Sequence, residues 1–194
     1  MSPLIKLKCL HCGNALAGEN NSRVFFCRVC DRGWDVDESE LREYPLVYIQ
    51  PEKESRHPAT YFPFWRIESD YSISDPHTFR NEIGNRISYI PAFFIKNINY
   101  FGDIGYFYTQ KRITPVEGSK KTIPIFPADR GLKHVLAYPS IYLFKEISQA
   151  EDVEKMEIRM EPKSYAILLI PFHKIDSEYI DSLISWKYPS GALI

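Results

Sequence analysis

The placement of apolar and aromatic residues around prolines and polar turns indicates strands and tight turns over most of the chain. Residues 23–26 predict a strand entering a turn, and residues 34–36 predict the strand leaving it. Five later segments place an apolar residue before a proline and an aromatic after it: 61–65, 89–94, 122–126, 138–142 and 169–172. A residue before proline favours extended backbone, and proline itself is found at strand starts, edges and bulges. Each segment therefore predicts a strand that packs its aromatic side chains inward.

Helix signals are fewer. Asp75 followed by proline is typical of an N-cap and a first helical position, which predicts a helix over 75–82. Ser148 and Glu151 have the spacing of a capping box leading into a helix through 155. Apolar residues at 179, 180, 183 and 184 form a helical stripe over 176–184. The expected fold class is α+β, dominated by strands, with two or three short helices.

Composition strengthens this expectation and narrows the function. Aromatic residues make up 14% of the 194-residue chain, and its 14 prolines outnumber its nine glycines, which favours strands and turns over helices. The net charge of −1 gives no support for strong nonspecific binding to nucleic acid. The longest apolar run, 165–172, is too short to span a bilayer, and the first ten residues lack a secretory signal.

Four cysteines carry the strongest chemical signal. Cys9 and Cys12 form one pair and Cys27 and Cys30 another, each with two intervening residues. Two such turns supply four thiolates to one tetrahedral ion and leave no position for water, so the site predicts one structural Zn²⁺. Two disulfides or a redox dithiol are the alternatives. The absence of other cysteines and of a secretory signal predicts a reducing cytoplasm, which argues against disulfides, and the lack of a βαβ pattern argues against the dithiol.

The cysteines and the hairpin between them, over residues 7–36, resemble the zinc-ribbon superfamily. Gly13 follows the first pair as in many zinc knuckles, whereas Asp31 stands where glycine often follows the second. A ribbon followed by the hexapeptide at 61–66 is also similar to a group of uncharacterised bacterial zinc-ribbon-containing proteins, to which no activity is attached.

The domain organisation expected is a ribbon with a short linker over 1–44 and a β-rich α+β domain over 45–194. An acidic stretch at 35–43 is interpreted as a short helix or linker between them, and residues 50–58 as an exposed loop. Because a small ribbon depends on its metal for folding, Cys27→Ser is expected to unfold the ribbon and to leave the larger domain folded.

Two further surfaces are candidates for binding. The aromatic residues form either an ordinary core or a cleft for a partner with Tyr61 and Trp65 at its mouth. Residues 96–134 contain seven lysines or arginines against three acidic residues, forming either an ordinary solvated surface or a basic face for nucleic acid. The members of that face are Lys111, Arg112, Lys120, Lys121, Arg130 and Lys133.

The chain contains no hydrolase elbow, metallopeptidase motif or phosphate-binding loop, so no enzyme is predicted. The leading hypothesis is a noncatalytic adaptor that docks to other proteins in a larger assembly. The alternative is a nucleic-acid-associated factor that uses the ribbon and the basic 111–134 surface.

Overall fold

The computed structural model describes residues 7–37, 40–52, 55–75, 80–120, 123–147 and 156–193. Its strands are β1 (Val24–Cys27), β2 (Arg32–Asp37), β3 (Glu40–Tyr48), β4 (Ala59–Asp75), β5 (Arg80–Pro91), β6 (Glu157–Ile175), β7 (Glu178–Asp181) and β8 (Lys187–Pro189). Its helices are α1 (Ile98–Phe101), α2 (Ile104–Gln110), α3 (Leu132–Val135), α4 (Tyr138–Ile147) and the 3₁₀ turn η2 (Ser190–Ala192). The strand-dominated α+β fold class is confirmed.

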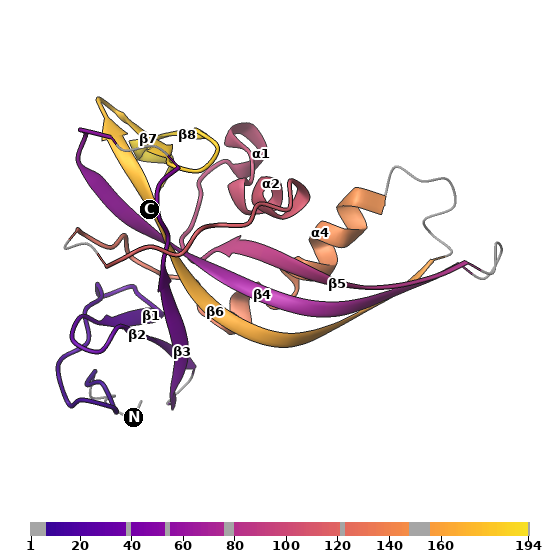
Figure 1. Cartoon of the computed structure of the whole chain (residues 1–194), viewed down its shortest axis with the longest axis horizontal. Coiled ribbons are helices and arrows are strands. Elements are labelled where there is room, and N and C mark those ends of the chain that lie inside the picture. The colour runs from indigo at the N-terminus through magenta and orange to yellow at the C-terminus, as the bar shows by residue number, and fades with distance from the viewer. Residues whose placement is uncertain are drawn as a thin grey trace.

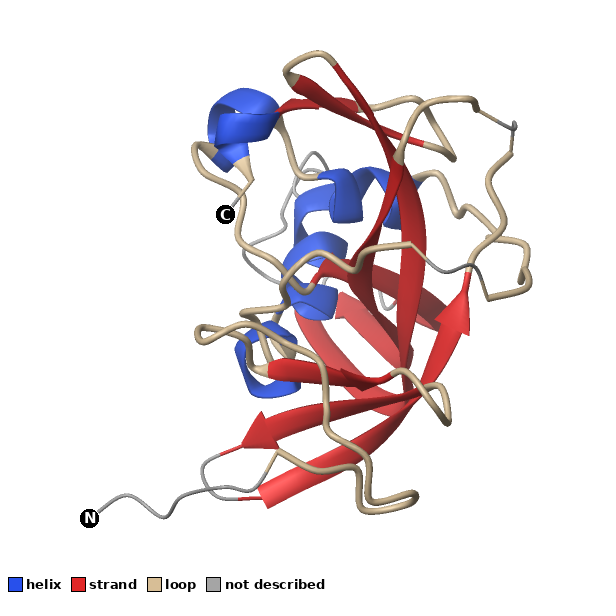
Figure 2. Cartoon of the chain, turned by 90° about the vertical axis from the view of Figure 1, so that its left-hand side faces the viewer, coloured by secondary structure: helices blue, strands red, loops and turns tan. Residues whose placement is uncertain are grey.

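Eight strands form one mixed sheet in the order β1-β2-β3-β6-β4-β5, with β7 and β8 added beside the end of β6. Strands β4, β5 and β6 are long and form an extended blade, while the N-terminal hairpin lies at the opposite end of the molecule (Figure 1). In Figure 2 the helices cluster close beside the strands.

Strand β3 joins the N-terminal hairpin to the main sheet. Its residues 40–45 pair antiparallel with β2, and residues 46–48 pair parallel with β6. The position between residues 44 and 45, where the ribbon was expected to end, therefore lies inside a strand. The acidic stretch expected to form a helix or linker belongs to β2 and β3 wherever the structure describes it.

The central strands are apolar on both faces. One face carries Trp65, and the other carries Phe62 and Phe64. The first core also contains Val24 and Phe26 of β1 together with residues of α3 and α4. Helices α1 and α2 and strands β7 and β8 pack on the second. Strands buried on both faces require near-continuous apolar runs, which explains the aromatic-rich segments of the sequence.

The strands expected at 23–26 and 34–36 are confirmed, as are those at 61–65 and 169–172, which lie within β4 and β6. The segment 89–94 is a strand only as far as Pro91, and 138–142 is helical because Pro139 fits the first turn of α4. Of residues 123–126, Ile125 makes a single parallel bridge to Tyr61.

The predicted helix at 75–82 is wrong. Strand β4 ends at Asp75 and β5 begins at Arg80, and the two pair in register from Asp75↔Arg80 to Phe64↔Pro91. The Asp-Pro signal therefore marks the connection of a hairpin. The helix expected from 148 to 155 lies outside the described residues.

The predicted helix at 176–184 is also wrong, because this segment is the β7 hairpin. Asp176 takes a left-handed φ of 52° in the turn that follows β6. At the far end, the carboxylate of Asp181 accepts hydrogen bonds from the backbone N–H groups of Leu183, Ile184 and Trp186. These bonds stabilise a local turn in place of helical hydrogen bonds.

Candidate metal centre

Two short turns position the four cysteines. The first lies between the bridged residues Lys8 and Ala15, and the second joins β1 to β2. In the first, the N–H of Gly13 donates to the carbonyl of Cys9 at 2.8 Å, and in the second the N–H of Asp31 donates to that of Cys27 at 3.1 Å. The two turns therefore hold their cysteines by equivalent backbone hydrogen bonds.

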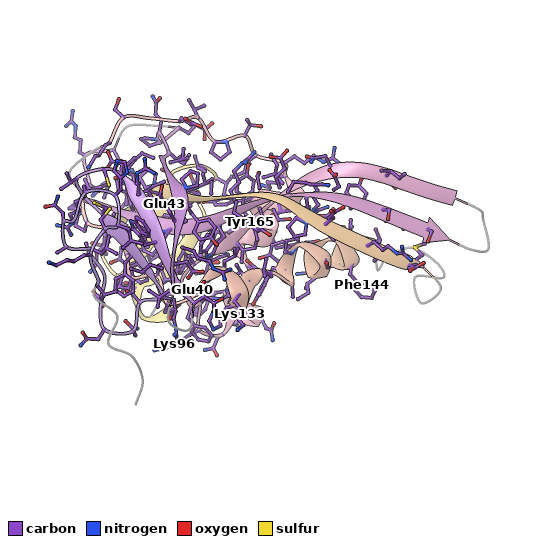
Figure 3. The ribbon with its side chains drawn as sticks, turned by 90° about the horizontal axis from the view of Figure 1, so that it is seen from below. Glu40, Glu43, Lys96, Lys133, Phe144 and Tyr165 are labelled. Carbon is purple, nitrogen blue, oxygen red and sulfur yellow. The ribbon has the colours of Figure 1, made fainter. Side chains whose placement is uncertain are left out.

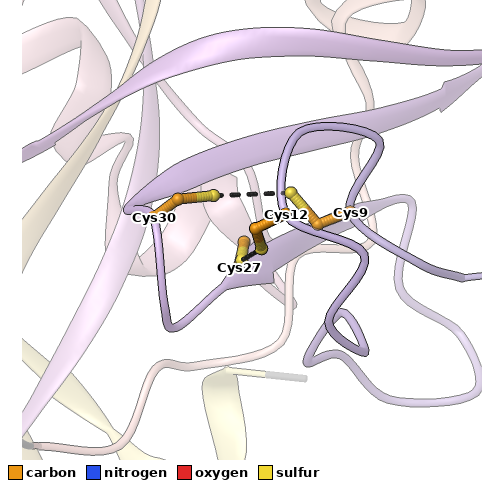
Figure 4. Close-up of side chains that lie close together, drawn as sticks. All are labelled: Cys9, Cys12, Cys27 and Cys30. Carbon is orange, nitrogen blue, oxygen red and sulfur yellow. Dashed lines mark hydrogen bonds between the residues drawn. The ribbon is translucent and has the colours of Figure 1, made fainter.

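The sulfur atoms converge on one point. Cys9 Sγ lies 3.4 Å from Cys30 Sγ, and Cys12 Sγ lies 3.4 Å from Cys27 Sγ, so each close contact joins the two turns (Figure 4). All four ligand atoms lie within 4.8 Å of one another. A disulfide would require about 2.05 Å. Four thiolates around a tetrahedral ion, with metal–sulfur bonds of about 2.3 Å, are separated by roughly 3.8 Å. The four cysteines are therefore positioned to bind one metal ion.

The local environment already favours ionisation of part of this cluster. The side chain of Asn14, whose Nδ2 lies 3.4 Å from Cys12 Sγ, lowers the pKa of Cys12 to about 6. At Cys9, burial opposes ionisation, but backbone hydrogen bonds from Cys12 and His11 lower its pKa overall. Burial raises the pKa of Cys30. A cation bound among the sulfurs would favour the thiolate form of every ligand.

A small apolar cluster supports the two turns. Phe25 and Trp34 are buried beside Cys9 and Cys27, and Leu16 packs against them. Four protein thiolates fill a tetrahedral shell, so a metal held here has no open position for water or substrate. Such a centre can stabilise a fold but cannot activate a water nucleophile.

Asp31 follows the second cysteine pair at a position where glycine is common, and the structure shows why aspartate fits there. Both Gly13 and Asp31 have left-handed backbone, with φ of 73° and 52°. Aspartate is one of the few other residues that adopt this conformation readily. Its carboxylate accepts a hydrogen bond from Tyr48 Oη at 3.0 Å and forms an ion pair with Lys120. Asp31 thus links the second cysteine turn to the larger part of the chain.

A second connection runs through Asp35 on β2. Its Oδ2 accepts a 3.0 Å hydrogen bond from the N–H of Leu132, at the start of α3, and burial raises the pKa of this carboxyl. Gly131 permits the approach, because a Cβ there would lie 2.4 Å from Asp35 Oδ1. The carbonyl of Ala128 also accepts hydrogen bonds from the backbone of Arg23 and Val24. The cysteine-bearing hairpin is therefore packed against the main body.

The aromatic candidates belong to the core. Tyr61 is 2% exposed and Trp65 is fully buried, with its indole N–H donating to the carbonyl of Arg130 at 2.8 Å. Neither side chain is accessible at the mouth of a cleft, so the two do not form a partner-binding site. Apolar composition could not separate these possibilities, because core and cleft aromatics have the same sequence pattern.

The basic residues proposed to form one face make separate contacts with different partners. Lys120 pairs with Asp31, Lys133 with Asp37 at 3.8 Å, and the guanidinium of Arg130 lies 4.6 Å from the ring centre of Tyr138. Lys111 and Arg112 are exposed at the end of α2 and make no ion pair within the described part of the chain. Lys121 lies outside the described residues. Two of these lysines therefore serve to hold the N-terminal hairpin.

Sequence reasoning missed a cavity of about 680 Å³ between the sheet and the segment that follows α2. Arg66 of β4, Arg112 after α2, and Leu168 and Ala166 of β6 are among the residues that line it. Arg66 ends the aromatic hexapeptide, and a charged residue directly after this apolar run was the only signal of the cavity in the sequence.

Comparison of the chain with models of known families, with curated proteins and with solved structures gave no match. Within the described ranges, no helix has the length and apolar character needed to cross a membrane.

Proposed function

We propose that this protein is a noncatalytic adaptor of the zinc-ribbon type, which holds one structural Zn²⁺ and docks to other proteins in a larger assembly. Zinc is favoured over other metals because a closed tetrahedral shell of four thiolates matches its preferred coordination. The four-thiolate shell and the short hairpins around it support membership of the zinc-ribbon superfamily. A reducing cytoplasm suits four free cysteines.

One observation carries the docking proposal: the cysteine turns expose apolar side chains at their tips. Leu10 lies between the first pair of cysteines and is 71% exposed, and Val29 lies between the second pair and is 64% exposed. Because Leu10 and Val29 flank sulfur atoms that converge on one centre, a bound ion would hold both tips rigidly. Apolar residues on a rigid surface bind partners at a low entropic cost.

A second exposed apolar surface is separate from the first. Ile141 and Phe144 of α4 are 51% and 50% exposed and lie three residues apart, on one side of the helix. Figure 3 shows Phe144 beneath the blade, far from Glu40 and Glu43 of β3 at the N-terminal end of the molecule. Two separated apolar surfaces suit a protein that connects two partners.

Affinity purification from the native cell tests the proposal. The protein is tagged at its C-terminus and isolated with and without nuclease, as wild type and as a Leu10→Ser, Val29→Ser variant. We expect a defined set of proteins to remain bound after nuclease and to be lost from the variant, although the variant retains its metal. Ile83→Ser provides the matched control, because Ile83 is equally apolar and exposed but lies on β5.

Other outcomes of this experiment contradict the proposal. A wild-type protein that purifies alone, or a partner set unchanged in the tip variant, argues against docking through the cysteine turns. Bound nucleic acid that is lost on nuclease treatment would instead support the alternative hypothesis of a nucleic-acid-associated factor. In that case Lys111 and Arg112 are the residues to substitute, because Lys120 and Lys133 contact the N-terminal hairpin.

A further inference from the structure

The cavity of about 680 Å³ begins where the apolar core of one sheet face stops. Along β4 the residues on this face change from Phe62 and Phe64 to Arg66, and along β6 they change from Leu168 to Ala166. Arg66 and Ala166 are direct cross-strand partners. A small residue opposite an arginine leaves space that the aromatic pairs fill elsewhere, and the cavity of about 680 Å³ occupies this region.

Arg66 is half-buried, and its charge is only partly neutralised by neighbouring groups. A guanidinium beside an apolar sheet face loses hydration unless acidic groups or hydrogen-bond acceptors replace the water. Its nearest carboxylate, Glu68, is 3.6 Å away and also accepts a hydrogen bond from Ser164. Its guanidinium also interacts with the hydroxyl of Tyr89, its cross-strand partner, so only part of its five-donor capacity remains available to a ligand.

Arg112, in the segment that follows α2, supplies a second guanidinium to the lining. It follows α2 with a left-handed φ of 49°, a conformation that is unfavourable for a non-glycine residue. It makes no ion pair within the described ranges. Arg86 also lines the cavity, but both of its terminal nitrogens contact Glu146.

The rest of the lining offers both apolar and polar surface, because Asn85, Thr109 and Thr114 stand among the aliphatic side chains. Val47, Ile87 and Leu168 contribute apolar side chains, and Glu117 is the one carboxylate among the described lining residues. Cavities of about 300–1,000 Å³ with apolar walls and a few polar groups are typical small-molecule sites. Arginine is well suited to carboxylate and phosphate groups, because its planar fork donates two parallel hydrogen bonds.

We propose that this cavity binds a small amphipathic anion, with an acidic head group between Arg66 and Arg112 and an apolar body over the β3–β6 floor. This site is distinct from the exposed tips of the cysteine turns, and its occupancy does not depend on docking to a partner. A carboxylate and a phosphate head satisfy the same donors.

Isothermal titration calorimetry of the purified, metal-loaded protein tests the site with eight-carbon probes below their micellar concentrations. Octanoate and octyl phosphate carry the proposed head groups, whereas octanamide and octylamine have a similar body without negative charge. We expect at least one anion to bind, and both uncharged and cationic probes to bind at least about tenfold more weakly, as loss of a charge-assisted contact predicts. The tighter of the two anions identifies the head group.

Variants locate the binding. Arg66→Gln and Arg112→Gln should each lower anion affinity about tenfold or more, and Ala166→Leu should abolish binding by filling the space without removing a charge. Arg159→Gln, on the exposed part of β6, is the matched control and should leave affinity unchanged. If Arg66→Gln fails to fold, Arg112→Gln decides, because its side chain is on the surface.

The proposal is overturned if neither anion binds, if octanamide binds as tightly as octanoate, or if both arginine variants retain full affinity. These outcomes leave the adaptor proposal intact, because the calorimetry contains no protein partner. Conversely, loss of partner binding in the Leu10→Ser, Val29→Ser variant leaves the anion site untouched.

Discussion

At the scale of single residues, the four cysteines could be identified from the sequence, but the residues that secure their turns could not. Spacing alone indicates which thiols share an ion, because each pair forms its own tight turn. Asp31 looks like an imperfect match to a glycine position. Its role depends on Tyr48 and Lys120, 17 and 89 positions away along the chain, which local patterns do not reveal.

Asp31 combines two effects that substitutions can separate. Asp31→Ala removes the contacts with Tyr48 and Lys120 and also places a side chain with no special tolerance for left-handed backbone at φ 52°. Asp31→Gly removes the same contacts but relieves the backbone. We expect both variants to be less stable than the wild type, and alanine to be worse than glycine by about 1 kcal/mol.

Urea unfolding of the metal-loaded proteins measures this difference. Equal stability of the alanine and glycine variants would show that the left-handed backbone costs nothing at this position. Wild-type stability in the alanine variant, which loses the contacts without relieving the backbone, would show that the contacts to Tyr48 and Lys120 contribute nothing.

At the scale of elements, the strands were easier to predict than the helices. Aromatic and β-branched runs at 61–65 and 169–172 are buried on both faces, and their pattern is strong enough to identify strands. The four α-helices are ten residues or fewer and depend on packing and capping more than on periodicity. Helix α2, for example, is capped by Asp103. Because Asp103 follows Gly102, the sequence predicts a turn at this position.

The capping carboxylate of α2 should make stability depend on pH. Asp103 accepts hydrogen bonds from the N–H groups of Gly105 and Tyr106 and from Tyr142 Oη, yet burial raises its pKa above the usual range. The folded state therefore binds this proton more tightly than the unfolded chain does. The contribution of Asp103 is most favourable at low pH and is lost as pH rises from its ordinary pKa through the raised one.

Asp103→Asn tests this sign, because asparagine is also a good N-cap and does not ionise. We expect the stability of the variant relative to wild type to increase between about pH 4 and pH 7, the range above the ordinary aspartate pKa. Urea midpoints of both proteins at each pH measure the difference, in which the shared protonation of the cysteines cancels. A constant difference, or a decrease with pH, would contradict the raised pKa.

At the scale of the whole molecule, the N-terminal hairpin and the main body share a core. Val24 and Phe26 of β1 pack in the same cluster as Tyr61 and Trp65 of β4. Strand β3 runs from one part into the other, and Asp31 and Asp35 bond across the boundary. The contacts that join the two parts connect residues far apart in the sequence. Local sequence patterns do not contain such contacts, and they therefore predicted an independent ribbon.

This shared core changes the expected effect of losing the metal. From sequence alone, Cys27→Ser should leave the larger domain folded. The packing of Val24 and Phe26 predicts instead that chelation or Cys27→Ser lowers the melting temperature of the entire chain. Thermal unfolding followed by tryptophan fluorescence and far-ultraviolet circular dichroism measures this effect. A main transition with an unchanged midpoint after metal removal would restore the independent-domain interpretation.

We propose that the four cysteines hold one structural zinc ion. Elemental analysis of the purified protein against its sulfur content, with a thiol titration before and after denaturation in chelator, tests it most directly. We predict one zinc per chain in the wild type, none in a Cys27→Ser, Cys30→Ser variant, and four reactive thiols only after the metal is removed. A metal-free folded protein, or a zinc content unchanged in the variant, would contradict the claim.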